Sequence, residues 1–102
     1  MAGMFAGSAF NKDISKWDVR NVRYMGRMFA RALFDQDISD WNISQVNSMR
    51  EMFMSSQFTK AELLNKWNDK IKEECDTYNM FKRTPEIDGY GKPITLPDFY
   101  KQ

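Results

Sequence analysis

Few residues in this sequence have side chains suited to chemistry, and their types argue against catalysis. The chain of 102 residues contains no histidine, the side chain that most often serves as a general base near neutral pH and as a zinc ligand. Cys75 is the only cysteine, and it lies on the apolar side of a predicted helix, so we expect a buried structural thiol. The sequence therefore predicts a protein that is not an enzyme and that uses no cofactor or metal.

Two acidic patterns are better explained as backbone supports than as active sites. The segment D-G-Y-G-K at residues 88–92 lacks the spacing and the following helix of a phosphate-binding loop, so it predicts a turn. Asp13 and Asp37 occupy equivalent positions in two copies of a repeat. We expect their carboxylates to accept backbone N–H bonds rather than to form a catalytic pair.

Four arginines are the strongest candidates for binding. They recur every three or four residues, and no acidic residue lies between Arg20 and Leu33, so a helix would place them in one stripe. Arginine suits bidentate contacts with carboxylate or phosphate groups, and a tyrosine among them could anchor a partner. The alternative is a solvated face paired with nearby carboxylates. The candidate partner-binding residues are Arg20, Arg23, Tyr24, Arg27 and Arg31.

The elements that must position these residues repeat every 24 residues. The stretch M-A-G-M-F-A-G-S-A-F-N-K-D-I-S-K-W at 1–17 recurs as M-G-R-M-F-A-R-A-L-F-D-Q-D-I-S-D-W at 25–41, and a third copy opens at Met49. A fixed period of this length predicts a solenoid, whose units bury their apolar faces against their neighbours. The arginines are not repeated, so the scaffold does not require arginine at these positions and they can serve another role. Their counterparts in the next copy are Ser44, Asn47, Glu51 and Ser55.

Local patterns predict both helices and strands within each repeat. Apolar side chains at helical spacing predict short helices at residues 22–32 and 46–56. Alternating apolar and polar side chains predict short strands at residues 10–15 and 34–39, which would pair in parallel.

The sequence after residue 58 departs from the repeat. Thr59 and Glu62 form a capping box, and they open a longer segment with one apolar and one charged face, as a capping helix would have. All three prolines follow residue 76, which predicts an extended or looped tail with at most a short strand. Within that tail, the residues from Tyr78 to Phe81 weakly resemble the M-x-x-M-F motif.

The repeated M-x-x-M-F and D-I-S-x-W motifs resemble those of the BspA-like leucine-rich repeat family, over residues 1–58. That family occurs in bacterial surface proteins and lipoproteins, and also in phage and viral genomes. The resemblance implies an α/β solenoid that binds other macromolecules, with no catalytic residues. Members usually carry many copies behind a secretion signal or a lipid anchor, whereas this sequence has two full copies, part of a third, and no export signal.

The predicted fold class is therefore α/β. We expect a short leucine-rich-repeat-like solenoid with parallel strands on one side and short helices on the other, closed by a C-terminal helix. One structural domain would contain the repeats at residues 1–58, the capping helix at 59–76 and the tail at 77–102.

Charge and hydropathy bear on the class of partner and on the location of the protein. Lysine and arginine number 15 against 14 acidic residues, so net charge does not favour nucleic acid, and no stretch resembles a signal peptide or a membrane span. We expect a cytoplasmic protein, in the host cytoplasm if it is phage-encoded. The strand edge at the start of the first repeat could also pair with a second copy, which would give a homo-oligomer.

The favoured function is a non-enzymatic protein–protein interaction module. A narrower hypothesis is a phage- or virus-encoded inhibitor that binds a host defence protein complex. Two alternatives stay open: nucleic-acid binding through the arginine stripe, and a truncated bacterial surface adhesin.

Overall fold

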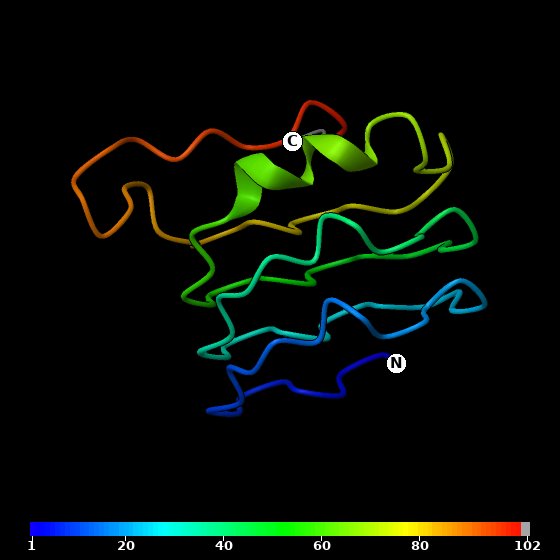
Figure 1. The fold of residues 1–102 in the computed structure, drawn as a ribbon, viewed down its shortest axis with the longest axis horizontal. Helices are drawn as coiled ribbons and strands as arrows, with labels where there is room; N and C mark the ends of the chain where they lie inside the picture. Colours follow the sequence, from blue (N-terminus) through cyan, green and yellow to red (C-terminus); the bar gives the residue numbers. More distant parts are fainter. Residues whose placement is uncertain (101–102) are drawn as a thin grey trace.

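The computed structural model describes residues 1–100, and these residues form stacked layers built almost entirely from turns (Figure 1). One regular helix lies among them, the 3-10 helix η1, Ala61–Trp67. In Figure 1 the chain rises layer by layer from the N-terminus to η1 and the tail. We name the layers by their residues: layer 1 is 1–24, layer 2 is 25–48, layer 3 is 49–76 and layer 4 is 77–84, followed by the tail at 85–100.

The α/β fold class predicted from the sequence is wrong. The described residues contain no sheet, because pairing is limited to isolated bridges. The segments expected as helices, 22–32 and 46–56, are not helical, and those expected as strands, 10–15 and 34–39, have no strand partner. The layers are therefore not a solenoid of parallel strands and short helices. The bridges join Tyr24 with Ser48, Ser48 with Asp76, and Ile87 with Pro93.

Each layer begins with an eight-residue box of overlapping turns, at residues 1–8, 25–32, 49–56 and 77–84. In layer 2, Arg27 and Arg31 adopt left-handed backbone conformations, with φ of 54° and 57°. A right-handed helix cannot continue through such residues, so the chain closes turns instead. The N–H of Met28, for example, donates to the carbonyl three residues earlier at 3.2 Å. The equivalent residues with positive φ in the other boxes are Gly3, Gly7, Glu51, Ser55, Asn79 and Arg83.

In layers 1 to 3, alternate N–H groups of the box bind the next layer. In layer 2 every second N–H, those of Arg27, Phe29 and Arg31, donates to a carbonyl of layer 3 at 2.9 Å. Layer 1 donates to layer 2 in the same way, and layer 3 donates to layer 4. The donors that would build an α-helix are thus divided between local turns and the neighbouring layer.

Columns of phenylalanine rings fill the interior. Phe29 is fully buried and stacks on Phe5 of the layer below and Phe53 of the layer above, with ring centroids 5.7 and 5.5 Å apart. Phe53 in turn stacks on Phe81 at 5.5 Å. Residues at the same position of successive repeats therefore lie one above another, as the period of the sequence predicted. A second column contains Phe10, Phe34 and Phe58.

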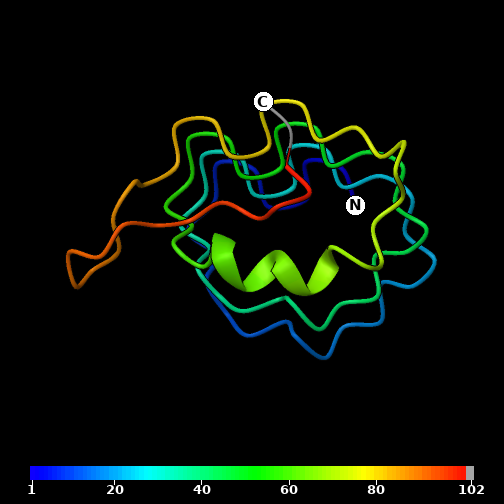
Figure 2. The same cartoon turned by 90° about the horizontal axis from the view of Figure 1, so that it is seen from above.

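η1 and part of the tail cover one end of the stack. Ala61, Leu64 and Trp67 of η1 are buried, and the Trp67 ring lies 6.2 Å from that of Phe99. Figure 2 shows η1 and the red segment of the tail over the interior of the layers.

The expected boundaries after residue 58 differ from the observed elements. Regular helix in the region expected at 59–76 covers Ala61–Trp67 only, and residues 77–84, expected in the tail, form the fourth box. Residues 101 and 102 of the expected tail lie outside the described residues. Within residues 1–100, no helix has the length and apolar character needed to cross a membrane.

The phenylalanine column predicts unequal effects for the same substitution in two layers. Phe29→Ala leaves a cavity between two rings and should lower the free energy of unfolding by about 3–5 kcal/mol. Phe5→Ala removes a ring that is only partly buried, at the end of the column, and should cost clearly less. Urea unfolding of the two variants measures this difference, and equal losses would contradict the stacked column.

The left-handed positions predict a reversed preference for glycine. Arg31→Gly should leave stability unchanged or raise it slightly, because glycine adopts positive φ without steric cost. Arg31→Val should lower the free energy of unfolding by about 1–2 kcal/mol, since a β-branched residue is strained there. Thermal and urea unfolding give the order, and a less stable glycine variant would refute the left-handed assignment.

Candidate functional site

The residues expected to bind a partner lie on the surface, but not in one stripe. Because no helix forms at residues 20–31, the four arginines separate into two groups. Arg20 and Arg23 line one open hollow, and Arg27 and Arg31 line another next to Ala6. The structure brings these arginines together in pairs rather than in a single row.

Ion pairing distinguishes the four arginines from one another. Arg27 Nε lies 2.6 Å from Oε1 of Glu51, which is its counterpart in the next layer. Arg20 lies 3.3 Å from Asp18, and both side chains are exposed. Arg23 and Arg31 form no ion pair with any described residue. Pairing with neighbouring carboxylates thus accounts for Arg20 and Arg27 and leaves the charges of Arg23 and Arg31 available.

A second cluster of aromatic and basic side chains was not anticipated from the sequence. The guanidinium carbon of Arg50 lies 4.4 Å from the ring centre of Tyr78, which is a cation–π distance. Arg50 also lies 3.4 Å from Asp76. Tyr24 and Tyr78 are both more than half exposed. The signal for this cluster was the weak fourth copy of the motif, which sequence reasoning placed in the tail.

The acidic side chains at turns accept backbone hydrogen bonds, as predicted. Oδ1 of Asp13 accepts the N–H of Ser15 at 2.9 Å, and Oδ1 of Asp37 accepts the N–H of Ser39 at 2.8 Å. The bond from the Ser15 backbone lowers the pKa of Asp13 below its usual value. These two carboxylates support turns and do not form a paired acid–base site.

The D-G-Y-G-K segment is also a turn. Asp88 accepts the backbone N–H groups of Lys92 and Tyr90 at 3.0 and 2.8 Å, and these bonds lower the pKa of its carboxyl. Within residues 1–100, no group of three or more histidine, cysteine, aspartate or glutamate side chains could hold a metal ion.

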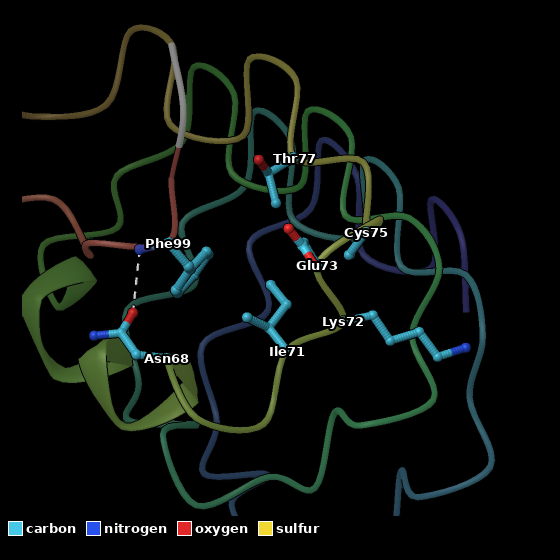
Figure 3. Close-up of a pocket in the computed structure, with 7 residues that line it drawn as sticks. All are labelled: Asn68, Ile71, Lys72, Glu73, Cys75, Thr77 and Phe99. Carbon is cyan, nitrogen blue, oxygen red and sulfur yellow. Dashed lines mark hydrogen bonds between the residues drawn. The ribbon is translucent and has the colours of Figure 1, made fainter.

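A pocket of about 270 Å³ lies beside Cys75 (Figure 3). Asn68 joins two parts of its wall, because its Oδ1 accepts the N–H of Phe99 at 3.1 Å. Burial raises the pKa of the Cys75 thiol to about 11, so this thiol is protonated at neutral pH and is a poor nucleophile. The pocket therefore offers shape and a few polar groups, and no activated side chain. Its walls consist of Asn68, Ile71, Lys72, Glu73, Cys75, Thr77 and Phe99.

Comparison with known proteins gives one family. The family model described as "Mycoplasma protein of unknown function, DUF285" matches residues 1–90, which include all four boxes. No curated protein and no solved structure matches the chain.

The raised pKa of Cys75 predicts slow alkylation. The shift from 9.0 to about 11 lowers the thiolate fraction near pH 8 by about a hundredfold. Iodoacetamide should therefore modify the folded protein at least about a hundred times more slowly than the urea-unfolded chain, and the rate should rise with pH up to about 11. Mass spectrometry of timed samples measures both rates. Equal rates in the two states would show that Cys75 is an ordinary exposed thiol.

Proposed function

Because this chain belongs to the DUF285 family, in the clan of BspA-like surface repeat proteins, we propose that it is a non-enzymatic protein–protein interaction module. The layered core supplies the support for this function. Positions that repeat between layers, such as those of Phe29 and Phe53, are buried and stacked on one another. Exposed positions that differ between layers can therefore carry different residues without disturbing the layered core.

The surface that would bind the partner, which we call the arginine face, consists of Arg20, Arg23 and Tyr24 of layer 1 and Arg27 and Arg31 of layer 2. The observation that carries the proposal is that Arg23 and Arg31 are exposed and lie outside any ion pair of the described residues. Each guanidinium can make two parallel hydrogen bonds to a carboxylate of a partner. Tyr24 follows Arg23 in the chain, is 58% exposed and would add aromatic contact area.

The ion pair between Arg27 and Glu51 would have a supporting role in this face. It holds the Arg27 side chain against layer 3, and its distance of 2.6 Å leaves less of the charge for a partner. We therefore assign direct contacts to Arg23, Tyr24 and Arg31 first. The exposed pair of Arg20 with Asp18 can open at little cost, because solvent screens such pairs strongly.

A segment of a surface-displayed repeat protein is the second candidate, and membership of the clan of BspA-like surface repeat proteins favours it. Both candidates bind other proteins, and they differ in where the chain acts. A cytoplasmic location, and the narrower role of a phage- or virus-encoded inhibitor of a host defence complex, stay predictions. Antibody labelling of intact cells separates the two candidates, because only a surface protein is labelled without permeabilisation.

Charge reversal on the arginine face tests the proposal. The double substitution Arg23→Glu and Arg31→Glu should reduce capture of specific partners by about tenfold or more, since each lost charged hydrogen bond contributes more than a kcal/mol. The matched control is Lys12→Glu with Lys16→Glu, which changes the charge equally at exposed sites of layer 1. Quantitative mass spectrometry of captured proteins gives the comparison. Proteins retained by wild type and by both double variants alike would refute recognition through this face.

A further inference from the structure

The box of layer 4 has backbone donors that no further layer uses. In layer 3 the N–H groups of Glu51, Phe53 and Ser55 donate to carbonyls of layer 4 at 2.8–2.9 Å. The equivalent N–H groups of layer 4 have no acceptor among residues 1–100. They belong to Asn79, Phe81 and Arg83.

These N–H groups form an edge that presents only hydrogen-bond donors. All interlayer bonds between the boxes run from the N–H of one layer to the C=O of the next, so layer 3 already occupies the carbonyls of Tyr78, Met80 and Lys82. The edge of a β-sheet alternates donors and acceptors, whereas this edge presents donors alone. Rows of neighbouring N–H groups carry partial positive charge and attract anions and carbonyl oxygens.

A groove of about 370 Å³ lies against this edge. Its described lining residues come from layer 4 and the tail. Its apolar part comes from Phe81, Leu96 and Tyr100, and the rings of Phe81 and Tyr100 meet edge to face at 5.2 Å. Lys82 and Arg83 supply positive charge, and no carboxylate lies among the described lining residues. Donors, cationic side chains and an apolar floor are thus combined in one place.

We propose that this groove, which we call the donor groove, binds an extended acidic peptide segment of a partner protein. The N–H groups of Asn79, Phe81 and Arg83 can donate to carbonyl and carboxylate oxygens of this segment. The segment need not form a regular strand, because the edge of a strand would also present its own N–H groups to these donors. Carboxylate side chains then face Lys82 and Arg83, while apolar side chains contact Leu96 and Tyr100. Recognition of acidic segments by backbone N–H groups and cationic side chains has this combination of contacts. The donor groove is separate from the arginine face, and the proposal does not depend on it.

Amide hydrogen exchange measured by NMR tests the backbone part of the proposal. The probe is a short, blocked peptide of alternating glutamate and leucine. In the free protein the amides of Asn79, Phe81 and Arg83 should exchange rapidly, whereas those of Glu51 and Phe53 are protected. With peptide at ten times its Kd, exchange at the three layer 4 amides should slow by about tenfold. Binding that leaves these amides unchanged overturns the proposal.

Two matched variants test the electrostatic part. Arg83→Gly removes a positive charge from the donor groove at a residue with φ of 60°, and Lys12→Gly makes the same change of charge at an exposed residue of layer 1 that belongs to neither proposed surface. Arg83→Gly should weaken peptide binding by about tenfold, and Lys12→Gly should leave it unchanged. Equal weakening by both variants would mean binding by overall charge and would overturn the proposal.

Other occupants give distinct results. A peptide with lysine in place of glutamate should not bind, and equal binding of it overturns the acidic specificity. A single-stranded oligothymidylate that protects the same amides more strongly than the acidic peptide would assign the groove to nucleic acid instead. Protection that grows with protein concentration alone, together with a larger sedimentation coefficient, would assign it to a second copy. The partner-capture experiment with Arg23 and Arg31 is unaffected by any of these outcomes.

Discussion

The fold depends on one backbone constraint, a left-handed residue at every fourth position of each box. At these residues, such as Arg27 and Arg31, the chain cannot continue as a right-handed helix. In each of the first three boxes, three N–H groups close turns within the box and three others, alternating with them, donate to the layer above. Because those interlayer bonds fix the vertical spacing, the rings of Phe5, Phe29 and Phe53 meet at stacking distance. The conformation of the box therefore determines how the side chains of the core pack.

The sequence predicted the vertical register of the fold but not its local conformation. Identical residues one repeat apart, such as Phe29 and Phe53, stack as the period required, and Asp13 and Asp37 accept backbone bonds in turns as expected. Helices were wrongly predicted because turns that recur every four residues place apolar side chains at nearly the spacing of a helix. The contrary signal was present in layer 1, where Gly3 and Gly7 occupy the two left-handed positions.

The fourth layer was missed because its motif is both altered and displaced. Thr77 stands where the other boxes have methionine, and Phe81 follows Phe53 by 28 residues, because η1 and its flanking residues lengthen layer 3. The Arg50–Tyr78 contact and the donor groove could not be deduced without this layer. Among the expected site residues, only Arg27 has an ion pair that the repeat pattern indicates, because Glu51 occupies the equivalent position one repeat later. The donors of Asn79, Phe81 and Arg83 are backbone groups, which no side-chain pattern reveals.

The claim that left-handed turns divide the hydrogen bonds is tested most directly by scalar couplings across hydrogen bonds in NMR spectra. The layered structure predicts a coupling between the amide nitrogen of Phe29 and the carbonyl carbon of Met52, and another between the amide nitrogen of Met28 and the carbonyl carbon of Met25, as in the observed bonds. A helical box would instead couple Phe29 to Met25, four residues earlier. Observation of that coupling, without the one to Met52, would contradict the layered structure.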